Sequence, residues 1–238
     1  MRKVLSVFIV CLLSLTLSAC SQPNENEGEN INPADEIVEP EIVEPEENME
    51  TGSDAHILIA YFTYGENANL SNGAEVSSSA SIQNWNGEVT GNAGVLAHMI
   101  HDAIEADLFS IRTVDPYPST YDETVAQGRS ENDADARPAL AVHIENLDQY
   151  DTIFIGFPNW WYDLPMAMYS FFEEYDFSGK TIIPFSTSGG SGFSDILQTI
   201  SELEPNATLL EGLTINSSQI SEAQNDVDAW LSSLGYGQ

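Results

Sequence analysis

Cysteine, basic residues and long apolar runs are all scarce in this sequence of 238 residues. The two cysteines, Cys11 and Cys20, lie near the N-terminus, and no other cysteine follows them. Residues beyond Cys20 therefore form no disulfide, no cysteine-ligated zinc or iron–sulfur site and no cysteine nucleophile.

Acidic side chains strongly outnumber basic ones in the chain as a whole. The chain has 38 acidic residues against six Lys and Arg, a formal net charge of −32. Twelve of the acids lie in residues 21–54, so residues 55–238 keep 26 against Arg112, Arg129, Arg137 and Lys180, a net charge of about −22. A surface of this charge repels nucleic acid and anionic lipid headgroups. We expect no nucleic-acid partner.

The N-terminal apolar stretch, residues 4–17, is too short for a comfortable membrane span. It follows Arg2 and Lys3 and ends in Leu17-Ser18-Ala19-Cys20, which is the layout of an export signal. Small residues before a cysteine resemble the lipobox of bacterial lipoproteins. The resemblance implies that residues 1–19 are a cleaved signal peptide and that Cys20 is lipidated, as by palmitate. An ordinary secretory peptide is the alternative.

We therefore expect an extracytoplasmic protein that is attached to a bacterial membrane only through the acyl chains of Cys20. Residues 20–54 are rich in Glu, Asn and Pro and repeat Glu-Ile-Val-Glu-Pro at 36–40 and 41–45. Such a segment buries too little apolar surface to offset its ordering entropy, which predicts a disordered acidic tether. An acidic binding tail is the alternative. Residues 55–238 have the length of one domain.

Three short apolar runs predict strands that are covered on both faces, as in a parallel sheet, because they lack in/out alternation. They are residues 57–62, 153–157 and 181–185, with weaker candidates at 108–114 and 208–215. Pro184 would remove a ladder hydrogen bond from a central strand, so we expect a bulge or an early strand end there.

Helical patterns alternate with these runs. Apolar residues recur at a period of 3.6 after Gly91, Pro165 suits a first helical position, and a further helix is expected around Tyr121 to Arg129. Ser221 and Gln224 form a capping-box pattern before the C-terminal helix. The alternation predicts a doubly wound α/β domain whose ligand lies beyond the carboxyl ends of the strands.

Three segments are expected to meet at those ends. Thr63 with Thr90-Gly91-Asn92-Ala93 lies at the start of a helix, where free amides and the helix dipole attract a phosphate. Pro158-Asn159-Trp160-Trp161 offers two indoles on which a planar heterocycle can stack. The segment 186–192, Ser-Thr-Ser-Gly-Gly-Ser-Gly, lets backbone amides approach a ligand closely.

The segments 57–63, 155–161 and 177–192 resemble the flavodoxin family, in particular its bacterial flavodoxin-like branch. The resemblance covers nearly the whole domain and implies a five-stranded flavodoxin fold that binds FMN and transfers electrons to an unidentified redox partner. The residues that it assigns to the cofactor fall into three groups. The phosphate would be held by Thr63, Thr90, Gly91 and Asn92. The isoalloxazine ring would be flanked by Trp160 and Trp161, next to Asn159, and Pro158 would set the turn that aims the two indoles. The other edge of the ring would be contacted by Thr187, Ser188, Gly189, Gly190 and Ser191.

Two features depart from the family pattern. The phosphate loop of flavodoxins is continuous, whereas here 26 residues, 64–89, separate Thr63 from Thr90. This insert is expected to be a flap over the site or a disordered excursion. Ala93 also stands where the family favours a hydroxyl residue, so one phosphate contact is expected to be missing.

Several alternatives stay open at this point. The domain could be an NAD(P)H-dependent or quinone-reducing flavin oxidoreductase, or a binding module that has lost the flavin. Ser191 resembles a hydrolase nucleophile, but Phe193 stands where the motif G-x-S-x-G needs its last glycine. His98 and His101 could share a metal, although solvated helix residues are the simpler interpretation.

Overall fold

The computed structural model describes residues 56–70 and 82–236 of the chain. The expectations for the signal peptide at 1–19, the tether at 20–54 and the lipidation of Cys20 lie outside these residues and stay predictions. Among the described residues, no helix is both long and apolar enough to span a bilayer.

A parallel sheet forms the centre of the domain, and its strand order is β4-β1-β5-β6-β7, with β8 also paired to β6. The strands of this sheet are β1 (Ile57–Tyr61), β4 (Asp107–Ser110), β5 (Thr152–Pro158), β6 (Thr181–Ser188), β7 (Thr208–Leu209) and β8 (Leu213–Asn216). A separate antiparallel hairpin consists of β2 (Ile82–Trp85) and β3 (Glu88–Gly91).

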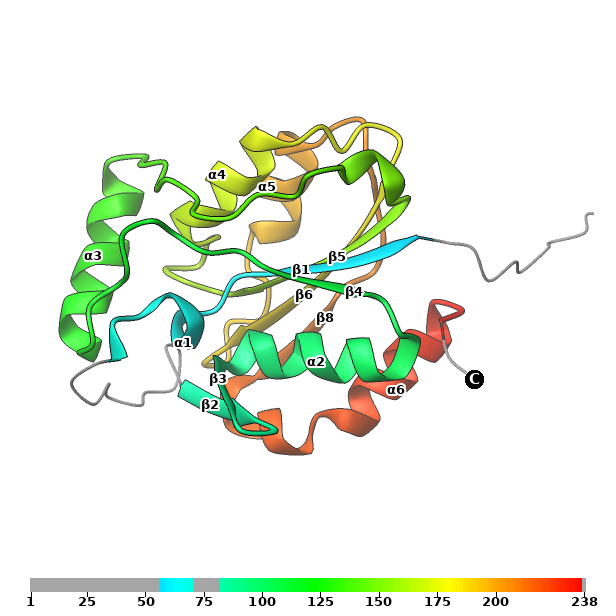
Figure 1. The fold of residues 1–238 in the computed structure, drawn as a ribbon, viewed down its shortest axis with the longest axis horizontal. Coiled ribbons are helices and arrows are strands. Elements are labelled where there is room, and N and C mark those ends of the chain that lie inside the picture. Colours follow the sequence, from blue (N-terminus) through cyan, green and yellow to red (C-terminus); the bar gives the residue numbers. More distant parts are fainter. Residues whose placement is uncertain (1–55, 71–81, 237–238) are drawn as a thin grey trace, which may run out of the picture. The chain divides into compact units, whose positions relative to one another are not determined.

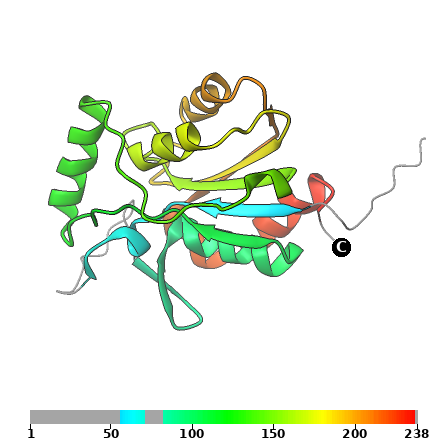
Figure 2. The same cartoon turned by 45° about the horizontal axis from the view of Figure 1, so that its top comes forward.

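The helices lie between the strands in the chain. They are α1 (Tyr64–Asn67), α2 (Asn92–Ile104), α3 (Tyr121–Asp133), α4 (Met166–Glu174), α5 (Ile196–Leu203) and α6 (Gln224–Ser233), with 3₁₀ turns η2 (Leu147–Gln149) and η3 (Ser217–Glu222). Helices α4 and α5 cover one face of the sheet, and α2 and α6 cover the other (Figures 1 and 2). The expected doubly wound α/β architecture is confirmed.

Burial on both faces follows from the alternation of side chains along each strand. In β1, Leu58 packs in the cluster of buried apolar residues beneath α4 and α5, whereas Ile59 packs in the cluster beneath α2 and α6. Both residues are almost fully buried. The apolar runs therefore show no alternation because each face of the sheet has its own core.

Pro184 is accommodated in a way that the sequence did not reveal. Strand β6 continues through it without ending, so the expected early end was wrong. The carbonyl of Ile182 accepts a hydrogen bond from the N–H of Leu210, which lies in the edge segment that contains β7 and β8. Backbone groups two residues apart in a strand point to the same side, so the nitrogen of Pro184 faces this segment too. At that point the edge is broken between β7 and β8. The fifth strand of the expected sheet is thus present in two short pieces, with the break beside the residue that lacks an N–H.

Two other expectations need correction. Thr187 and Ser188, assigned to a binding loop, are the last residues of β6. The capping box does not form, because α6 begins after Ala223 without a side-chain cap and Ser221 lies in η3. For the insert 64–89, residues 71–81 lie outside the described residues, so the expectation of a flap or a disordered excursion stays a prediction there. In the described parts, α1 is mostly buried, and Trp85 of the hairpin stacks on His98 of α2 at 5.7 Å.

Gly156 tests how tightly the central strands pack. A Cβ atom added at Gly156 would lie 2.2 Å from two ring carbons of Phe185, which is fully buried. Gly156→Ala should therefore lower the free energy of unfolding by about 1–3 kcal/mol, the usual cost of overpacking a core. Urea titration followed by tryptophan fluorescence measures the loss. Gly189→Ala is the control, since no heavy atom lies within 4 Å of its added Cβ. Equal stability of the two variants would contradict the packing argument.

Candidate functional site

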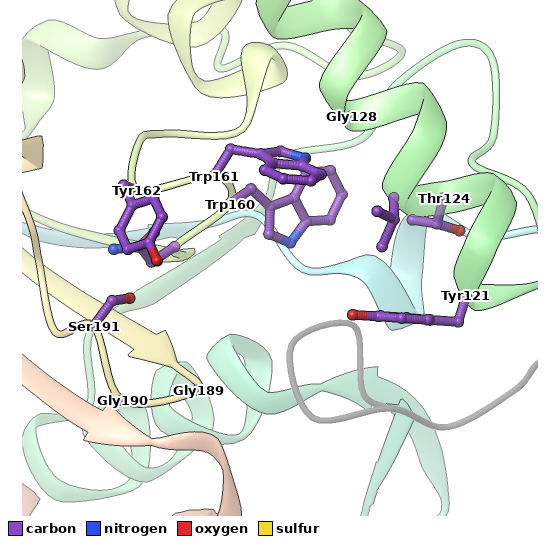
Figure 3. Close-up of a pocket in the computed structure, with 11 residues that line it drawn as sticks. Tyr121, Thr124, Gly128, Trp160, Trp161, Tyr162, Gly189, Gly190 and Ser191 are labelled. Carbon is purple, nitrogen blue, oxygen red and sulfur yellow. The ribbon is translucent and has the colours of Figure 1, made fainter.

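A cavity of about 580 Å³ opens beyond the carboxyl ends of β5 and β6. Its walls come from the loop after β5, the loop after β6 and one side of α3 (Figure 3). The residues that line it are Tyr121, Thr124, Val125, Gly128, Asn159, Trp160, Trp161, Tyr162, Gly189, Gly190 and Ser191. The ends of parallel strands are the expected place for a ligand in an open α/β sheet.

Helix α3 forms one wall rather than part of the core. It lies beyond the ends of the strands in Figure 1, and it buries only Thr124 and Gly128, both of which line the cavity. A glycine inside a helix costs roughly 1 kcal/mol relative to alanine, so its presence needs a packing reason. A Cβ at Gly128 would lie 3.3 Å from Trp160, which supplies that reason.

Trp160 is held from behind by two aromatic rings. Its indole packs edge-to-face on Phe62 at 5.6 Å and on Tyr117 at 5.3 Å between ring centroids. Edge-to-face pairs at this spacing are favourable because the positive ring edge meets the negative ring face. The indole is therefore partly a core residue and partly a fixed wall of the cavity.

Trp161 and Tyr162 lie in a strained tight turn. Trp160 and Asp163 exchange two backbone hydrogen bonds of 3.0 Å, and the two residues between them have φ values of +55° and +67°. Such a turn favours Asn-Gly, because side chains with a Cβ are disfavoured at positive φ. The turn that presents the aromatic side chains thus lies after Trp160 and not at Pro158, which is the last residue of β5.

Strain of this kind persists only where the surroundings enforce it, and it concentrates at functional sites. Trp161 is 43% exposed and Tyr162 is 70% exposed, so burial of the rings does not explain the strain. The guanidinium of Arg129 lies 4.9 Å from the ring centroid of Trp161, which supports the indole from the side of α3. The turn therefore keeps two large aromatic side chains at the mouth of the cavity.

Asn159 ties the two loops together. Its backbone N–H donates to the carbonyl of Thr187, which continues the pairing of β5 with β6 beyond the strand ends. Its side-chain amide donates to the carbonyl of Gly192 at 2.8 Å and to the hydroxyl of Ser194 at 3.1 Å. Asn159 is itself buried, so these bonds are shielded from water.

The loop after β6 is shaped from inside by Ser188. The hydroxyl of this residue accepts bonds from the N–H groups of Gly190 at 3.2 Å and Gly192 at 3.0 Å. These two amides, expected to approach a ligand, are thus engaged within the loop. Gly189, Gly190 and Ser191 nevertheless line the cavity, whereas Thr187 and Ser188 are buried behind it.

The residues expected to bind a phosphate lie elsewhere. Thr63, Thr90, Asn92 and Ala93 are all buried, and none of them is among the lining residues of the cavity in the described part of the chain. Thr90 and Gly91 end β3, and Asn92 begins α2. The hydroxyl of Thr90 donates to the carboxylate of Glu66 at 2.6 Å. Thr90 is thus engaged by a carboxylate, and the side-chain oxygen of Asn92 accepts a bond from the side-chain amide of Gln83 at 2.8 Å.

The histidines of α2 have structural partners. His98 stacks on Trp85, and Nδ1 of His101 donates to the carbonyl of Ala106 at 2.6 Å. Within the residues that the structure describes, no group of three or more His, Cys, Asp or Glu side chains could hold a metal ion.

Sequence reasoning missed the wall formed by α3, the exposed Tyr162 and the carboxylate of Glu66. The interior glycine at 128, next to Arg129, was a usable signal for the wall. Tyr162 follows directly on the tryptophan pair and could have been included with it. Glu66 lies in the insert, and nothing in the sequence links it to residues 90 and 110.

The strain in the turn can be measured directly. Replacing Trp161 by Asn together with Tyr162 by Gly should raise the free energy of unfolding by about 1–2 kcal/mol, since this pair adopts positive φ at low cost. Thermal unfolding followed by circular dichroism measures the gain. Tyr162→Ala is the matched control: it removes the ring but keeps a Cβ at positive φ, and it should give no gain. A double variant less stable than the parent protein would show that the turn is not strained.

Comparisons with known proteins identify the family and the fold. A flavodoxin family model matches residues 87–234. A putative flavoprotein from Bacteroides uniformis is 25% identical with a TM-score of 0.57, over 75% of this chain and 98% of that one. A putative flavoprotein from Bacteroides eggerthii is 27% identical with a TM-score of 0.56, over 76% of this chain and 98% of that one.

A Lactobacillus acidophilus flavoprotein in complex with FMN shares the fold at 14% identity, with a TM-score of 0.50 over 71% of this chain and 97% of that one. A search of curated proteins returns no match. The family model spans more than half of the sequence, and the parallel sheet with helices on both faces agrees with it. The chain therefore belongs to the flavodoxin family.

Proposed function

We propose that this protein binds a flavin in the aromatic cavity and acts as a single-domain electron carrier. The observation that carries the proposal is the cavity itself, which combines a fixed indole, a strained aromatic turn and a glycine-containing loop at the carboxyl ends of the strands. A complex with FMN in a protein of the same fold supports it.

The cavity suits the isoalloxazine part of a flavin. Its volume of about 580 Å³ lies within the roughly 300–1,000 Å³ typical of small-molecule sites. Trp160 and Trp161 provide flat surfaces on one side, and Gly189 and Gly190 provide a wall without side chains on another. Tyr121 of α3 lies across the cavity from the loop that contains Gly189 and Gly190 (Figure 3).

An electron carrier needs the ring held in place and one edge within reach of a partner. A bound flavin supplies the redox chemistry, while the protein orients it and limits its contact with water. The exposure of Trp161 and Tyr162 at the mouth leaves an approach for a redox partner.

FMN is the flavin that the family resemblance implies. Its phosphate would go to the segment that includes Thr63, Thr90, Gly91 and Asn92. The described structure fits this end of the cofactor poorly, because the hydroxyl of Thr90 is already bound to the carboxylate of Glu66. The proposal therefore rests on the ring, which FMN shares with flavins that lack the phosphate.

The proposal includes the location of the protein. Leu17-Ser18-Ala19-Cys20 supports lipidation of Cys20 after removal of residues 1–19. The acyl chains would attach the extracytoplasmic domain to a bacterial membrane through residues 20–54. Acyl chains contribute about 0.8 kcal/mol per buried CH₂, so several of them anchor a protein without a spanning helix.

Flavin binding by the purified protein tests the proposal. Titration of FMN or riboflavin should quench flavin fluorescence as the ring stacks on the indoles. Trp161→Ala should weaken binding by about two- to tenfold, since stacking contributes about 0.5–1.5 kcal/mol beyond burial. Trp85→Phe is the control, because Trp85 stacks on His98 and does not line the cavity. Equal losses in both variants would place the flavin elsewhere.

The same preparation separates the competing functions. Absence of binding to either flavin would favour the flavin-free binding module. Rapid bleaching of the loaded protein by NADPH alone would favour an oxidoreductase over a carrier.

Membrane attachment has its own test. Cys20→Ser should move the protein from the detergent phase to the aqueous phase after phase partition of cells that express it, because the acyl chains can no longer be added. Cys11→Ser is the matched control, and it should remain in the detergent phase, since Cys11 leaves with the signal peptide. Detergent partition of both variants would argue against lipidation at Cys20.

A further inference from the structure

Glu66 is a buried carboxylate with four hydrogen-bond donors, and its side chain is only 6% exposed. Its Oε1 accepts bonds from the hydroxyls of Tyr61 at 3.0 Å and Thr90 at 2.6 Å. Its Oε2 accepts bonds from the hydroxyl of Ser110 and from Nη2 of Arg112, the latter at 2.8 Å. A carboxylate has about four lone-pair sites, so its capacity is filled.

The donors come from separate elements of the fold. Tyr61 ends β1, Thr90 lies in β3 and Ser110 ends β4, while Glu66 itself lies in α1. Burial raises the pKa of the Tyr61 hydroxyl, and the negative charge of Glu66 raises it further, so this tyrosine stays a neutral donor. The network thus collects hydroxyl groups from three strands onto one charged group.

The carboxylate lies against the first turn of α2. A Cβ built on Gly94 would lie 3.3 Å from Oε1 of Glu66 and 1.8 Å from the hydroxyl oxygen of Thr90. The start of a helix attracts negative charge, because its first N–H groups are free and the helix dipole is positive there. Gly91, the N-cap of α2, provides no side-chain cap. Glu66 therefore brings an anion to the helix start at which the resemblance places a phosphate.

The position of Glu66 is fixed by its neighbours. A Cβ on Gly65 would lie 1.9 Å from the carbonyl oxygen of Thr90, so α1 packs directly on the end of β3. Arg112 binds both the side chain and the backbone of Glu66, since its Nη2 donates to the carboxylate and its Nη1 donates to the Glu66 carbonyl at 2.9 Å. Asn67 bonds the carbonyls of Thr63 and Ile111. Displacing the carboxylate would disrupt contacts with several elements at once.

We propose that Glu66 is a built-in substitute for the cofactor phosphate, and that the cavity takes a flavin ending in an uncharged polyol chain in preference to FMN. The inference rests on the proposed function, because it concerns the far end of the same ligand. Two anions do not share one set of donors, and like charges brought together without water oppose binding. The hydroxyl of Thr90, which would serve a phosphate, serves the carboxylate. The family's ring site is retained, and its phosphate site is filled by the chain itself.

Equilibrium titration with riboflavin and FMN tests the proposal, with quenching of flavin fluorescence as the readout. The unaltered protein should bind riboflavin more tightly than FMN. Glu66→Gln keeps the shape of the side chain and removes its charge, so it should tighten FMN binding by about tenfold and change riboflavin binding little. Glu174→Gln is the control, since it removes the same charge from α4 on the opposite face of the sheet and should alter neither affinity.

The outcomes separate this inference from the proposed function. If the unaltered protein binds FMN as tightly as riboflavin or more tightly, the inference is wrong and the flavin carrier stands. If Glu66→Gln folds and leaves the ratio of the two affinities unchanged, the carboxylate is not the selecting group. Binding of neither flavin overturns the proposed function together with the inference. The ratio of the riboflavin and FMN affinities is measured on the unaltered protein. The inference can therefore be tested even if the Glu66→Gln variant does not fold.

Discussion

The cavity depends on the pairing of the two central strands and on its continuation by Asn159. Strands β5 and β6 pair from Thr152 with Thr181 to Pro158 with Thr187, and Asn159 adds one more backbone bond and two side-chain bonds. The loop that carries the indoles and the loop that carries the glycines are thereby fixed relative to each other. Loss of this link would leave each wall of the cavity free to move alone.

The fold could be predicted from sequence because its signals are local. Apolar runs without alternation identified β1, β5 and β6, and a period of 3.6 identified α2, since both patterns follow directly from burial. The broken fifth strand could not be predicted in the same way. Pro184 showed that one backbone donor would be missing. The sequence does not show whether the strand that contains Pro184 ends there or the neighbouring strand is interrupted instead.

The candidate site was predictable only where side chains follow a strand end in the sequence. Trp160, Trp161 and the glycines at 189 and 190 belong to that class. The wall from α3 was missed because Thr124 and Gly128 are not apolar and give no periodic signal. Glu66 meets Thr90 and Ser110 only through tertiary packing, at separations of 24 and 44 residues. The family resemblance assigns the ring contacts to residues several of which line the cavity, whereas the residues it assigns to the phosphate are not among the lining residues of that cavity in the described part of the chain.

The division of the fifth strand also bears on how the domain behaves at high concentration. An exposed sheet edge is a template for pairing with another chain, and short or interrupted edge strands limit that risk. One edge of this sheet is the two-residue β7 followed by the four-residue β8, and the other is the four-residue β4, which begins with Asp107. Neither edge offers a long uninterrupted row of backbone groups. Together with the strong negative charge, this keeps crowded copies of the domain from joining edge to edge into aggregates.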